Sequence, residues 1–378
     1  MTDLDDLFEQ EFPVDTNLLY LNHAAVAPWP MRTGDAVRQF AAECVDMGAH
    51  DYGSWLEQER FLRTQCARLV NAASADDIAL IKNTSEGLSM VAHGMPWQAG
   101  DNVIIPAGEF PSNRIVWQSL ERYGVELRQI QLTESADPES DLIAAADGHT
   151  RLLSVSSVQY VTGLRLDLAR LGRQCRERGI ALCVDAIQGL GVVPHDVQGM
   201  AIDFLVADGH KWLLGPEGIG VFYCAPAWRA RLALHEYGWH MTEDPGDFDR
   251  IEWTPAASAR RFECGSPNML GIHALSASLE LLEEAGLAEI ERRVLGHARR
   301  LMDGIAATAD LELLTRDEPR RYAGIVSFRH RRLPASTLFA HLQGQRVVCA
   351  LRGGAIRLSP HAYHRPEVIE QVLDLISI

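Results

Sequence analysis

Lys211 is the first residue whose setting in this sequence suggests chemistry. It lies in the stretch DFLVADGHKWLLGPEGIGVFY, between two apolar runs. The first run is typical of a buried strand, and in doubly wound sheets ligands collect at the carboxyl ends of strands. A lysine amine placed there can act as a nucleophile if its surroundings lower its pKa. A solvated loop lysine is the alternative, and this segment alone does not separate the two interpretations.

A carboxylate ends another apolar run. Asp185 closes the stretch IALCVDA, and Gln188 follows three residues later. Burying a carboxylate is costly unless it meets a cation or hydrogen-bond donors, so Asp185 needs a positively charged partner. A protonated ring nitrogen would supply one. The alternative is an aspartate that caps the next turn.

A phosphate site is indicated between a predicted strand and a predicted helix. Thr84 and Ser85 stand at the start of that helix, where free backbone N–H groups and two hydroxyls favour an anion. Asn83 followed by Glu86 is also an ordinary capping box, so capping remains the competing interpretation.

Two further residues extend the set. Phe110 follows the strand DNVIIP in a turn, where its ring can lie against a flat ligand or plug a core. Arg357 stands behind a glycine pair in a short strand, where a guanidinium can bind a carboxylate through two parallel hydrogen bonds. Pyridoxal 5'-phosphate acting on an amino acid requires five such groups. They are a Schiff-base lysine, a carboxylate for the ring nitrogen, a phosphate site, a stacking ring and an arginine for the substrate carboxylate.

With these motifs the sequence resembles the class V aminotransferase family of pyridoxal-phosphate enzymes, which includes cysteine desulfurases, selenocysteine lyases, kynureninases and isopenicillin N epimerase. The resemblance spans nearly the whole chain through the motifs LYLNHAAVAPWP, NTSEG, EFPSN, YVTG, VDAIQ, DGHKWLLGPEGIG, FECGSPN and RGGAIRLSPHAYH. It implies an aspartate-aminotransferase-like fold and a homodimer whose active sites lie at the subunit interface.

The resemblance also implies roles for individual residues. Lys211 is similar to the lysine that forms the internal aldimine, and Asp185 to the partner of the pyridine nitrogen. Gln188 is similar to the residue that donates to the phenolic oxygen of the cofactor. Thr84, Ser85 and His210 are similar to residues near the phosphate, and Ser266 is similar to a residue whose hydroxyl reaches the phosphate from the neighbouring subunit. The implied substrate contacts are Arg357 for the carboxylate and His23 as a lining residue.

Several positions depart from the family pattern. Phe110 stands where many members stack a histidine on the ring, and Tyr160 stands where desulfurases tend to carry asparagine. Asp208 replaces a serine or threonine that donates to the phosphate, which an ionised carboxylate cannot do. Cys349 is the one candidate for the persulfide-carrying cysteine of desulfurases, but it lies in the predicted strand RVVCAL, where packing is the more common role.

The elements that would position these residues follow an α/β pattern. From about residue 75 onward, short apolar runs alternate with helical patterns, which predicts a mainly parallel sheet covered on both faces. After Pro267 the pattern changes to two successive helices, broken near Gly286, and then to short strands and two more helices. We therefore expect an N-terminal arm (1–25), a large cofactor-binding domain (26–265) and a small α+β domain (266–378).

Composition narrows the possible partners. The net charge of −16 and the lack of a basic block argue against binding to nucleic acid or an anionic membrane. Seven cysteines without metal spacing fit a reducing cytoplasm and no metal site. The acidic N-terminus lacks the features of a signal peptide, and no apolar window is long enough for a membrane span. We expect a cytoplasmic protein whose substrate is a small molecule, an amino acid.

Two other classes of protein compete with this prediction. A pyridoxal-phosphate binder without turnover would act as a regulator, yet no appended DNA-binding module is visible. A nucleotide-dependent α/β enzyme would need a glycine-rich phosphate turn before a helix, and GPEGIG does not open one. The sequence predicts a pyridoxal-phosphate enzyme, with an aminotransferase leading and a selenocysteine-lyase- or desulfurase-like β-lyase, or an epimerase- or kynureninase-like enzyme, as the alternative. It does not fix the substrate.

Overall fold

A computed structural model describes residues 3–15 and 17–377. Its main element is a seven-stranded sheet with the strand order β2-β8-β7-β6-β5-β3-β4. The strands are β2 (Ile78–Ile81), β3 (Asn102–Pro106), β4 (Glu126–Ile130), β5 (Thr150–Ser156), β6 (Ala181–Asp185), β7 (Phe204–Asp208) and β8 (Gly220–Cys224). The strands from β4 to β7 pair in parallel, while β8 runs antiparallel to both of its neighbours.

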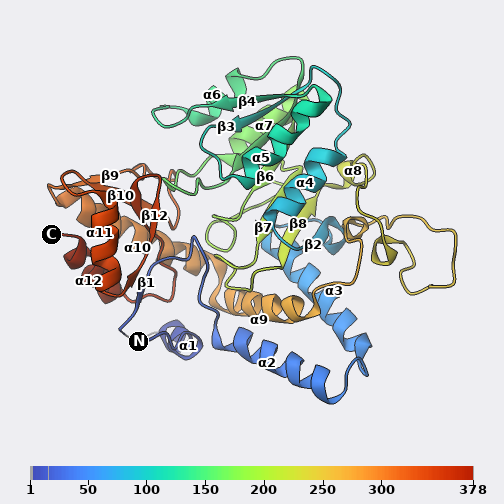
Figure 1. Ribbon diagram of the computed structural model, residues 1–378, viewed down its shortest axis with the longest axis horizontal. Helices are drawn as coiled ribbons and strands as arrows, with labels where there is room; N and C mark the ends of the chain where they lie inside the picture. Colours follow the sequence, from blue (N-terminus) through green and yellow to red (C-terminus); the bar gives the residue numbers. More distant parts are fainter. Residues whose placement is uncertain (1–2, 16, 378) are drawn as a thin grey trace.

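Both faces of this sheet are buried, as the uninterrupted apolar runs predict. Except in the edge strand β4, none of whose residues is fully buried, alternate residues of the strands enter two different cores: Leu182 and Val184 of β6 lie in one, and Ala181 and Cys183 in the other. One core is completed by the helices α3 (Tyr52–Leu69), α7 (Leu168–Arg178) and α9 (Met269–Ala285), and the other by α4 (Thr84–Gly94) and α5 (Ser112–Gln118). The sheet thus forms the middle layer of a three-layer unit (Figure 1).

A smaller sheet lies on the other side of the molecule, with its own core (Figure 1). Its strand order is β12-β13-β10-β9, and all pairs are antiparallel. The strands are β9 (Leu311–Leu313), β10 (Val326–His330), β12 (Ala350–Arg352) and β13 (Ala355–Leu358). The helices α10 (Leu287–Ala307), α11 (Ala335–Gly344) and α12 (Pro366–Ile376) contribute to the same core.

The N-terminal segment connects these parts. Strand β1 (Leu19–Tyr20) pairs in parallel with β11 (Val347–Val348), so Leu19 enters the core of the smaller sheet. The remaining N-terminal helices are α1 (Asp3–Glu11) and α2 (Met31–Asp46), and α2 packs against α9. The short helices are α6 (Pro138–Ala144), α8 (Pro226–Arg229) and the 3-10 turns η1 (Ala75–Asp77), η2 (Ser119–Tyr123), η3 (Trp239–Met241) and η4 (Ala259–Phe262).

The loop after β5 joins the two sheets. The carbonyl oxygens of Tyr160, Val161 and Thr162 each accept a hydrogen bond from a side chain of the smaller domain. The donors are Arg357 Nη1 at 2.8 Å, Ser327 Oγ at 2.5 Å and Thr315 Oγ1 at 2.7 Å. Three successive backbone contacts fix the smaller sheet, and Arg357 with it, against the carboxyl edge of the larger one.

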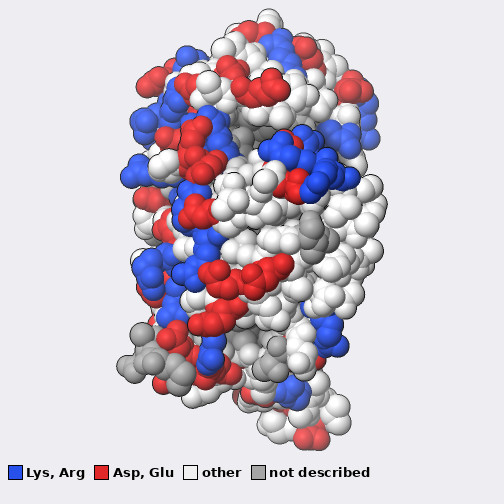
Figure 2. Space-filling model, turned by 90° about the vertical axis from the view of Figure 1, so that its left-hand side faces the viewer, with Lys and Arg blue, Asp and Glu red and all other residues white. Residues whose placement is uncertain are grey.

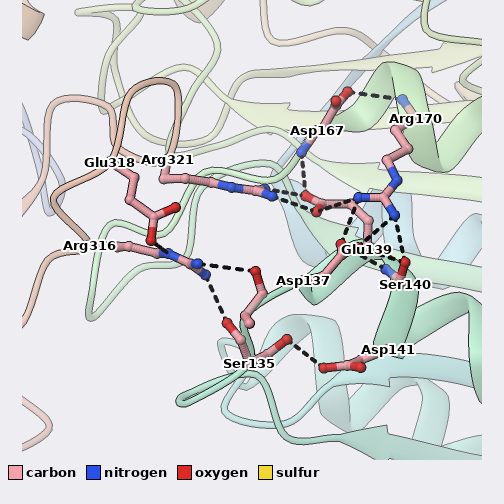
Figure 3. Close-up of polar contacts among 11 residues, drawn as sticks. Ser135, Asp137, Glu139, Ser140, Asp141, Asp167, Arg170, Arg316, Glu318 and Arg321 are labelled. Carbon is pink, nitrogen blue, oxygen red and sulfur yellow. Dashed lines mark hydrogen bonds and ion pairs between the residues drawn. The ribbon is translucent and has the colours of Figure 1, made fainter.

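An ion network centred on the buried Glu139 joins the same two parts (Figure 3). Arg321 Nη2 lies 2.9 Å from Oε2 of Glu139, and Arg321 Nη1 lies 2.5 Å from Oε1. Glu139 is 0% exposed and also accepts a 2.7 Å hydrogen bond from the Asp167 backbone N–H. Burial raises the pKa of the Glu139 carboxyl, but the contacts with Arg321 outweigh burial and lower it overall. Arg170 lies beside this carboxylate and binds Asp137 through two hydrogen bonds.

Charges on the outer face of the smaller domain are mixed. Figure 2 shows that acidic and basic residues lie side by side there instead of gathering by sign. Ion pairs of the smaller domain include Arg300 with Glu370 and Arg329 with Glu312. None of the described helices is both long and apolar enough to cross a membrane.

The predicted α/β fold with a smaller α+β part is confirmed. The two helices predicted on either side of Gly286 are α9 and α10, and Gly286 has the positive φ of 78° that ends the first of them. The limits predicted for the arm and the two domains stay predictions.

Candidate active site

The predicted site residues meet because their strands are parallel. β2, β3, β5, β6 and β7 end at the same edge of the large sheet, since β8 alone reverses direction. Thr84, Phe110, Tyr160, Asp185 and Asp208 each lie at or just after one of these five ends. Residues that lie more than a hundred positions apart in the sequence thereby meet where ligands of α/β sheets bind.

Lys211 lies in the middle of this group and is 8% exposed. Burial lowers the pKa of its amine to about 8, with the charges of Asp185 opposing the shift and Arg357 adding to it. Its Nζ atom lies 5.6 Å from the centroid of the Phe110 ring. At this pKa about a tenth of the amine is neutral at pH 7, and the neutral amine is the form that acts as a nucleophile or base.

Asp185 faces Lys211 from the end of β6 and is 1% exposed. Burial raises the pKa of its carboxyl to about 6, while the Ile187 N–H and the Lys211 charge oppose that shift. A second buried acid, Glu109, accepts a 2.7 Å hydrogen bond from the Ser156 N–H, and burial raises its pKa to about 7. Sequence reasoning missed Glu109, although it directly precedes Phe110 in the GEFPSN motif.

Unsatisfied polar atoms mark the predicted phosphate cradle. Thr84 Oγ1 is buried at the first turn of α4 and has no hydrogen-bond partner. Asp208 Oδ1 and His210 Nδ1 lie 3.2 Å apart, but their orientation does not form a hydrogen bond, and both atoms are otherwise unpartnered. Asn83 caps the same helix by accepting a 3.0 Å bond from the Glu86 N–H, so capping and an anion site coexist.

Gln188 is oriented by its neighbours. The Trp212 indole N–H donates to Gln188 Oε1 at 3.1 Å, and Gln188 Nε2 donates to the Ala24 carbonyl at 3.0 Å. Because an indole N–H can only donate, the amide oxygen must face Trp212. One of the two N–H bonds of Gln188 then remains for an acceptor such as a phenolic oxygen.

Arg357 is held at the edge of the site and is 2% exposed. Its Nη1 atom donates to the Tyr160 carbonyl, while its Nε is buried without a partner. The ring of Tyr160 meets that of Phe110 edge to face, with 5.2 Å between the centroids. A buried guanidinium with free donors is a site for a carboxylate.

The three remaining predicted residues are placed differently. Ser85 donates to Ser112 Oγ at 2.7 Å and is exposed beside Thr84. His23 is 0% exposed, and its two ring nitrogens contact the Ser359 carbonyl and the Tyr363 hydroxyl, so it packs between elements instead of facing an open pocket. Ser266 is exposed beside a separate small cavity. Their roles toward cofactor and substrate stay predictions.

The side chains present fit the expected cofactor. A phosphate dianion would satisfy Thr84 and the His210 ring, and the buried Asp185 carboxylate suits a protonated ring nitrogen. Asp208 does not fit as a donor while ionised, and its Oδ1 lies 3.2 Å from His210 Nδ1.

Comparisons with known proteins agree with this geometry. The family model described as "Aminotransferase class-V" matches residues 19–365. A cysteine desulfurase of Yersinia pseudotuberculosis serotype O:1b (strain IP 31758) is 33% identical over an alignment of 322 residues that covers 82% of this chain and 77% of the relative. A probable cysteine desulfurase of Methanothermobacter thermautotrophicus is 28% identical over 384 residues, covering 96% of this chain and 94% of the relative.

Solved structures share the fold. The cystine C–S lyase C-DES in complex with its reaction product cysteine persulfide matches 97% of this chain and 99% of its own, with a TM-score of 0.90 and 22% identity. The cysteine desulfurase CsdA of Escherichia coli matches 100% of this chain and 98% of its own, with a TM-score of 0.88 and 23% identity. Another structure of C-DES holds glycine covalently linked to the pyridoxal-phosphate cofactor.

Proposed function

The chain belongs to the class V aminotransferase family of pyridoxal-phosphate enzymes, and from that premise we propose that it is a β-lyase that cleaves the Cβ–S bond of a sulfur-containing amino acid. The relatives reported above are desulfurases, and the similar structures include a cystine lyase. They support the lyase alternative better than the aminotransferase that the sequence led us to expect.

Pyridoxal 5'-phosphate supplies the electron withdrawal that makes the α-proton of a bound amino acid acidic. The protein residues then divide the remaining tasks. Lys211 would hold the cofactor and afterwards take the α-proton on Nζ, which its pKa near 8 favours. Asp185 would keep the ring nitrogen protonated, and Arg357 would bind the substrate carboxylate.

The observation that carries the proposal is the burial of Cys349. It lies between β11 and β12 in the core of the smaller sheet, eight residues before Arg357, and burial raises the pKa of its thiol to about 12. A neutral thiol packed among apolar side chains is a poor acceptor of sulfur. This supports a reaction in which sulfur leaves with part of the substrate and not on a protein thiolate.

The other cysteines give no better candidate among the described residues. Cys66, Cys175, Cys183 and Cys224 are buried, and burial raises the pKa of each. Cys264 is partly exposed, and burial together with Glu236 raises the pKa of its thiol. Cys44 is exposed on α2, which is not one of the elements that supply the candidate site.

The reaction is tested by its products. The protein, saturated with cofactor, is incubated with L-cystine and with L-cysteine, and pyruvate, ammonia, alanine and persulfide are measured. We expect pyruvate and ammonia in equal amounts, with the same rate for the matched Cys349→Ala variant. Alanine as the main product, lost in Cys349→Ala, would establish desulfuration instead. Amino transfer to a 2-oxo acid at a higher rate than pyruvate release would restore the aminotransferase.

The predicted homodimer remains part of the proposal. Ser266 is exposed in its own chain, and the family resemblance implies that its hydroxyl reaches the phosphate of the neighbouring subunit. Sedimentation of the cofactor-loaded protein gives its oligomeric state, and the cofactor affinity of Ser266→Ala tests whether this hydroxyl contributes to the phosphate site. A monomer with full affinity would exclude it.

A further inference from the structure

Glu109 is a buried acid that the proposed reaction does not use. It lies in the loop after β3, directly before Phe110, and is 4% exposed. Among residues 3–15 and 17–377, no lysine, arginine or histidine lies within ion-pair distance of its carboxyl. Glu139, the other deeply buried glutamate discussed above, is paired with Arg321. A buried acid that no cation neutralises is costly, and such acids are concentrated at functional sites.

Both carboxyl oxygens of Glu109 contact Ser156. The Ser156 N–H donates to Oε1 at 2.7 Å, and Ser156 Oγ lies 2.5 Å from Oε2. The side chain of Asn113 in α5 also favours the ionised carboxyl. Because these partners are neutral, burial prevails over them and raises the pKa of Glu109 to about 7. Glu109 therefore gains or loses its proton close to neutral pH.

Ser156 brings Glu109 close to Asp185. Ser156 of β5 and Asp185 of β6 are register partners in a parallel pair, and the Ser157 N–H donates to the Asp185 carbonyl at 2.9 Å. Register partners in neighbouring strands lie side by side on one face of the sheet, about 5 Å apart. The charge of Asp185 accordingly adds to the raised pKa of Glu109. The two acids share one buried region at the carboxyl edge of the large sheet.

A cation beside Asp185 would change the charge of Glu109. The site fits a protonated ring nitrogen against Asp185, and a positive charge there favours the ionised form of each acid nearby. Because binding and protonation are linked, an ionised Glu109 strengthens the binding of that cation in return. Two charges roughly 10 Å apart, at the effective dielectric constant of about 20 that suits protein sites, shift each other's pKa by about one unit.

We propose that Glu109 is a positioning residue for the cofactor, a second acid that acts together with Asp185 to hold the proton on the ring nitrogen. Glu109 releases its own proton to solvent when the cofactor binds, and it is an anion in the loaded protein at neutral pH. Two negative charges instead of one then favour the protonated, electron-withdrawing form of the ring. This inference rests on the role proposed for Asp185 and not on which bond of the substrate is cleaved.

A purely structural role is the competing explanation. Glu109 attaches the loop after β3 to β5, and the ring of Phe110 is held by the same loop. Glu109→Gln separates the two roles, because the amide has the size of the acid and carries no charge. Its oxygen can accept from the Ser156 N–H, and its NH2 group can donate to Ser156 Oγ. The variant therefore mimics Glu109 in its protonated form.

The test measures the affinity for pyridoxal 5'-phosphate as a function of pH, without any substrate. At about pH 5.5 the wild-type protein and Glu109→Gln should bind the cofactor nearly equally, and at about pH 8.5 the wild type should bind about tenfold more tightly. Glu121→Gln changes an exposed glutamate in η2 and is the matched control, which should follow the wild type.

The other titratable groups that face Asp185 and the phosphate site are Lys211, Asp208 and His210. They are the same in every variant, so the difference between two pH profiles reports Glu109. The 1-deaza analogue of the cofactor, in which carbon replaces the ring nitrogen, tests the assignment to that atom. With this analogue the tenfold difference should disappear, and its persistence would overturn the proposal.

Equal weakening by Glu109→Gln at both pH values would make Glu109 a structural anchor of the loop, and identical profiles would show that its charge does not reach the cofactor. Either result overturns the proposal. If Glu109→Gln does not fold, Ser156→Ala decides, because loss of a donor to the ionised acid should move the gain in affinity to a higher pH. An unmoved profile would then exclude Glu109. No reaction product is measured, so failure of the lyase and failure of this inference remain distinct.

Discussion

Two groups of charged residues in this protein are built on opposite plans. In the network that joins the two sheets, Arg321 and Arg170 donate paired hydrogen bonds to Glu139 and Asp137 (Figure 3). At the carboxyl edge of the large sheet, Lys211 has no ion pair among the described residues, although it lies close enough to Asp185 for their charges to interact.

The same contrast holds for individual atoms. Thr84 Oγ1, Asp208 Oδ1, His210 Nδ1 and Arg357 Nε are buried at the site without hydrogen-bond partners. Buried unsatisfied groups cost free energy, so a fold retains them where a ligand supplies the missing partner. The network therefore stabilises the arrangement of the two sheets. The unpaired groups of the site destabilise the protein until cofactor and substrate supply their partners.

The largest expected effect comes from Lys211. The sequence contains two lysines, Lys82 and Lys211, which makes Lys82→Ala a matched control. Lys211→Ala should lower turnover by about a thousandfold or more, because it removes both the cofactor attachment and the base. Borohydride reduction followed by peptide mass spectrometry should find the cofactor on Lys211. Label on Lys82 would contradict the assignment.

Next in size is the loss of the network. Arg321→Met leaves the fully buried Glu139 carboxylate without its main partner, and should lower the free energy of unfolding by about 3 to 5 kcal/mol. Arg329→Met is the control, because Arg329 and its partner Glu312 are both partly exposed, and a change of about 1 kcal/mol or less is expected. Denaturant unfolding measures both. Similar losses of unfolding free energy in the two variants would contradict the special role of the network around Glu139.

Removing the charge of Asp185 should change the stability in the opposite direction. Its pKa is raised from 3.8 to about 6, so the folded protein retains a proton that the unfolded chain has lost. The cofactor-free protein therefore loses stability as the pH rises from 3.8 to about 6, and the full loss persists at higher pH. Asp185→Asn should stabilise the cofactor-free protein at pH 7 by on the order of 2 to 3 kcal/mol. A destabilised variant would show that Asp185 is a structural group.

The smallest effect on stability is expected at Thr84. Thr84→Val removes a buried hydroxyl that has no partner, so the cofactor-free protein should keep its stability to within about 1 kcal/mol. Affinity for pyridoxal 5'-phosphate should fall about tenfold or more, because a hydrogen bond to a charged group is lost. Thermal unfolding and cofactor titration measure the two quantities, and unchanged affinity would remove Thr84 from the phosphate site.

Much of the fold could be predicted because its signals are local. Apolar runs without alternation mark β6 and β7 as strands buried on both faces, and the spacing of apolar residues marks α9 and α10. The reversed direction of β8 was not predictable, since strand pairing joins residues far apart in sequence. The network around Glu139 was equally hidden, because it depends on the approach of Arg321 from the other domain.

For the candidate site, the sequence by itself determined which groups are present: a lysine after one strand, a carboxylate at the end of another, hydroxyls at a helix start and an arginine behind a glycine pair. Residue type and local pattern are sufficient for that. Tertiary structure decided which of these groups lack partners, since burial and hydrogen bonding depend on every element that packs around an atom. It placed His23 in a closed contact with Ser359 and Tyr363 and Cys349 inside a core, and it brought Lys211 and Arg357 to one site at the carboxyl edge of the large sheet.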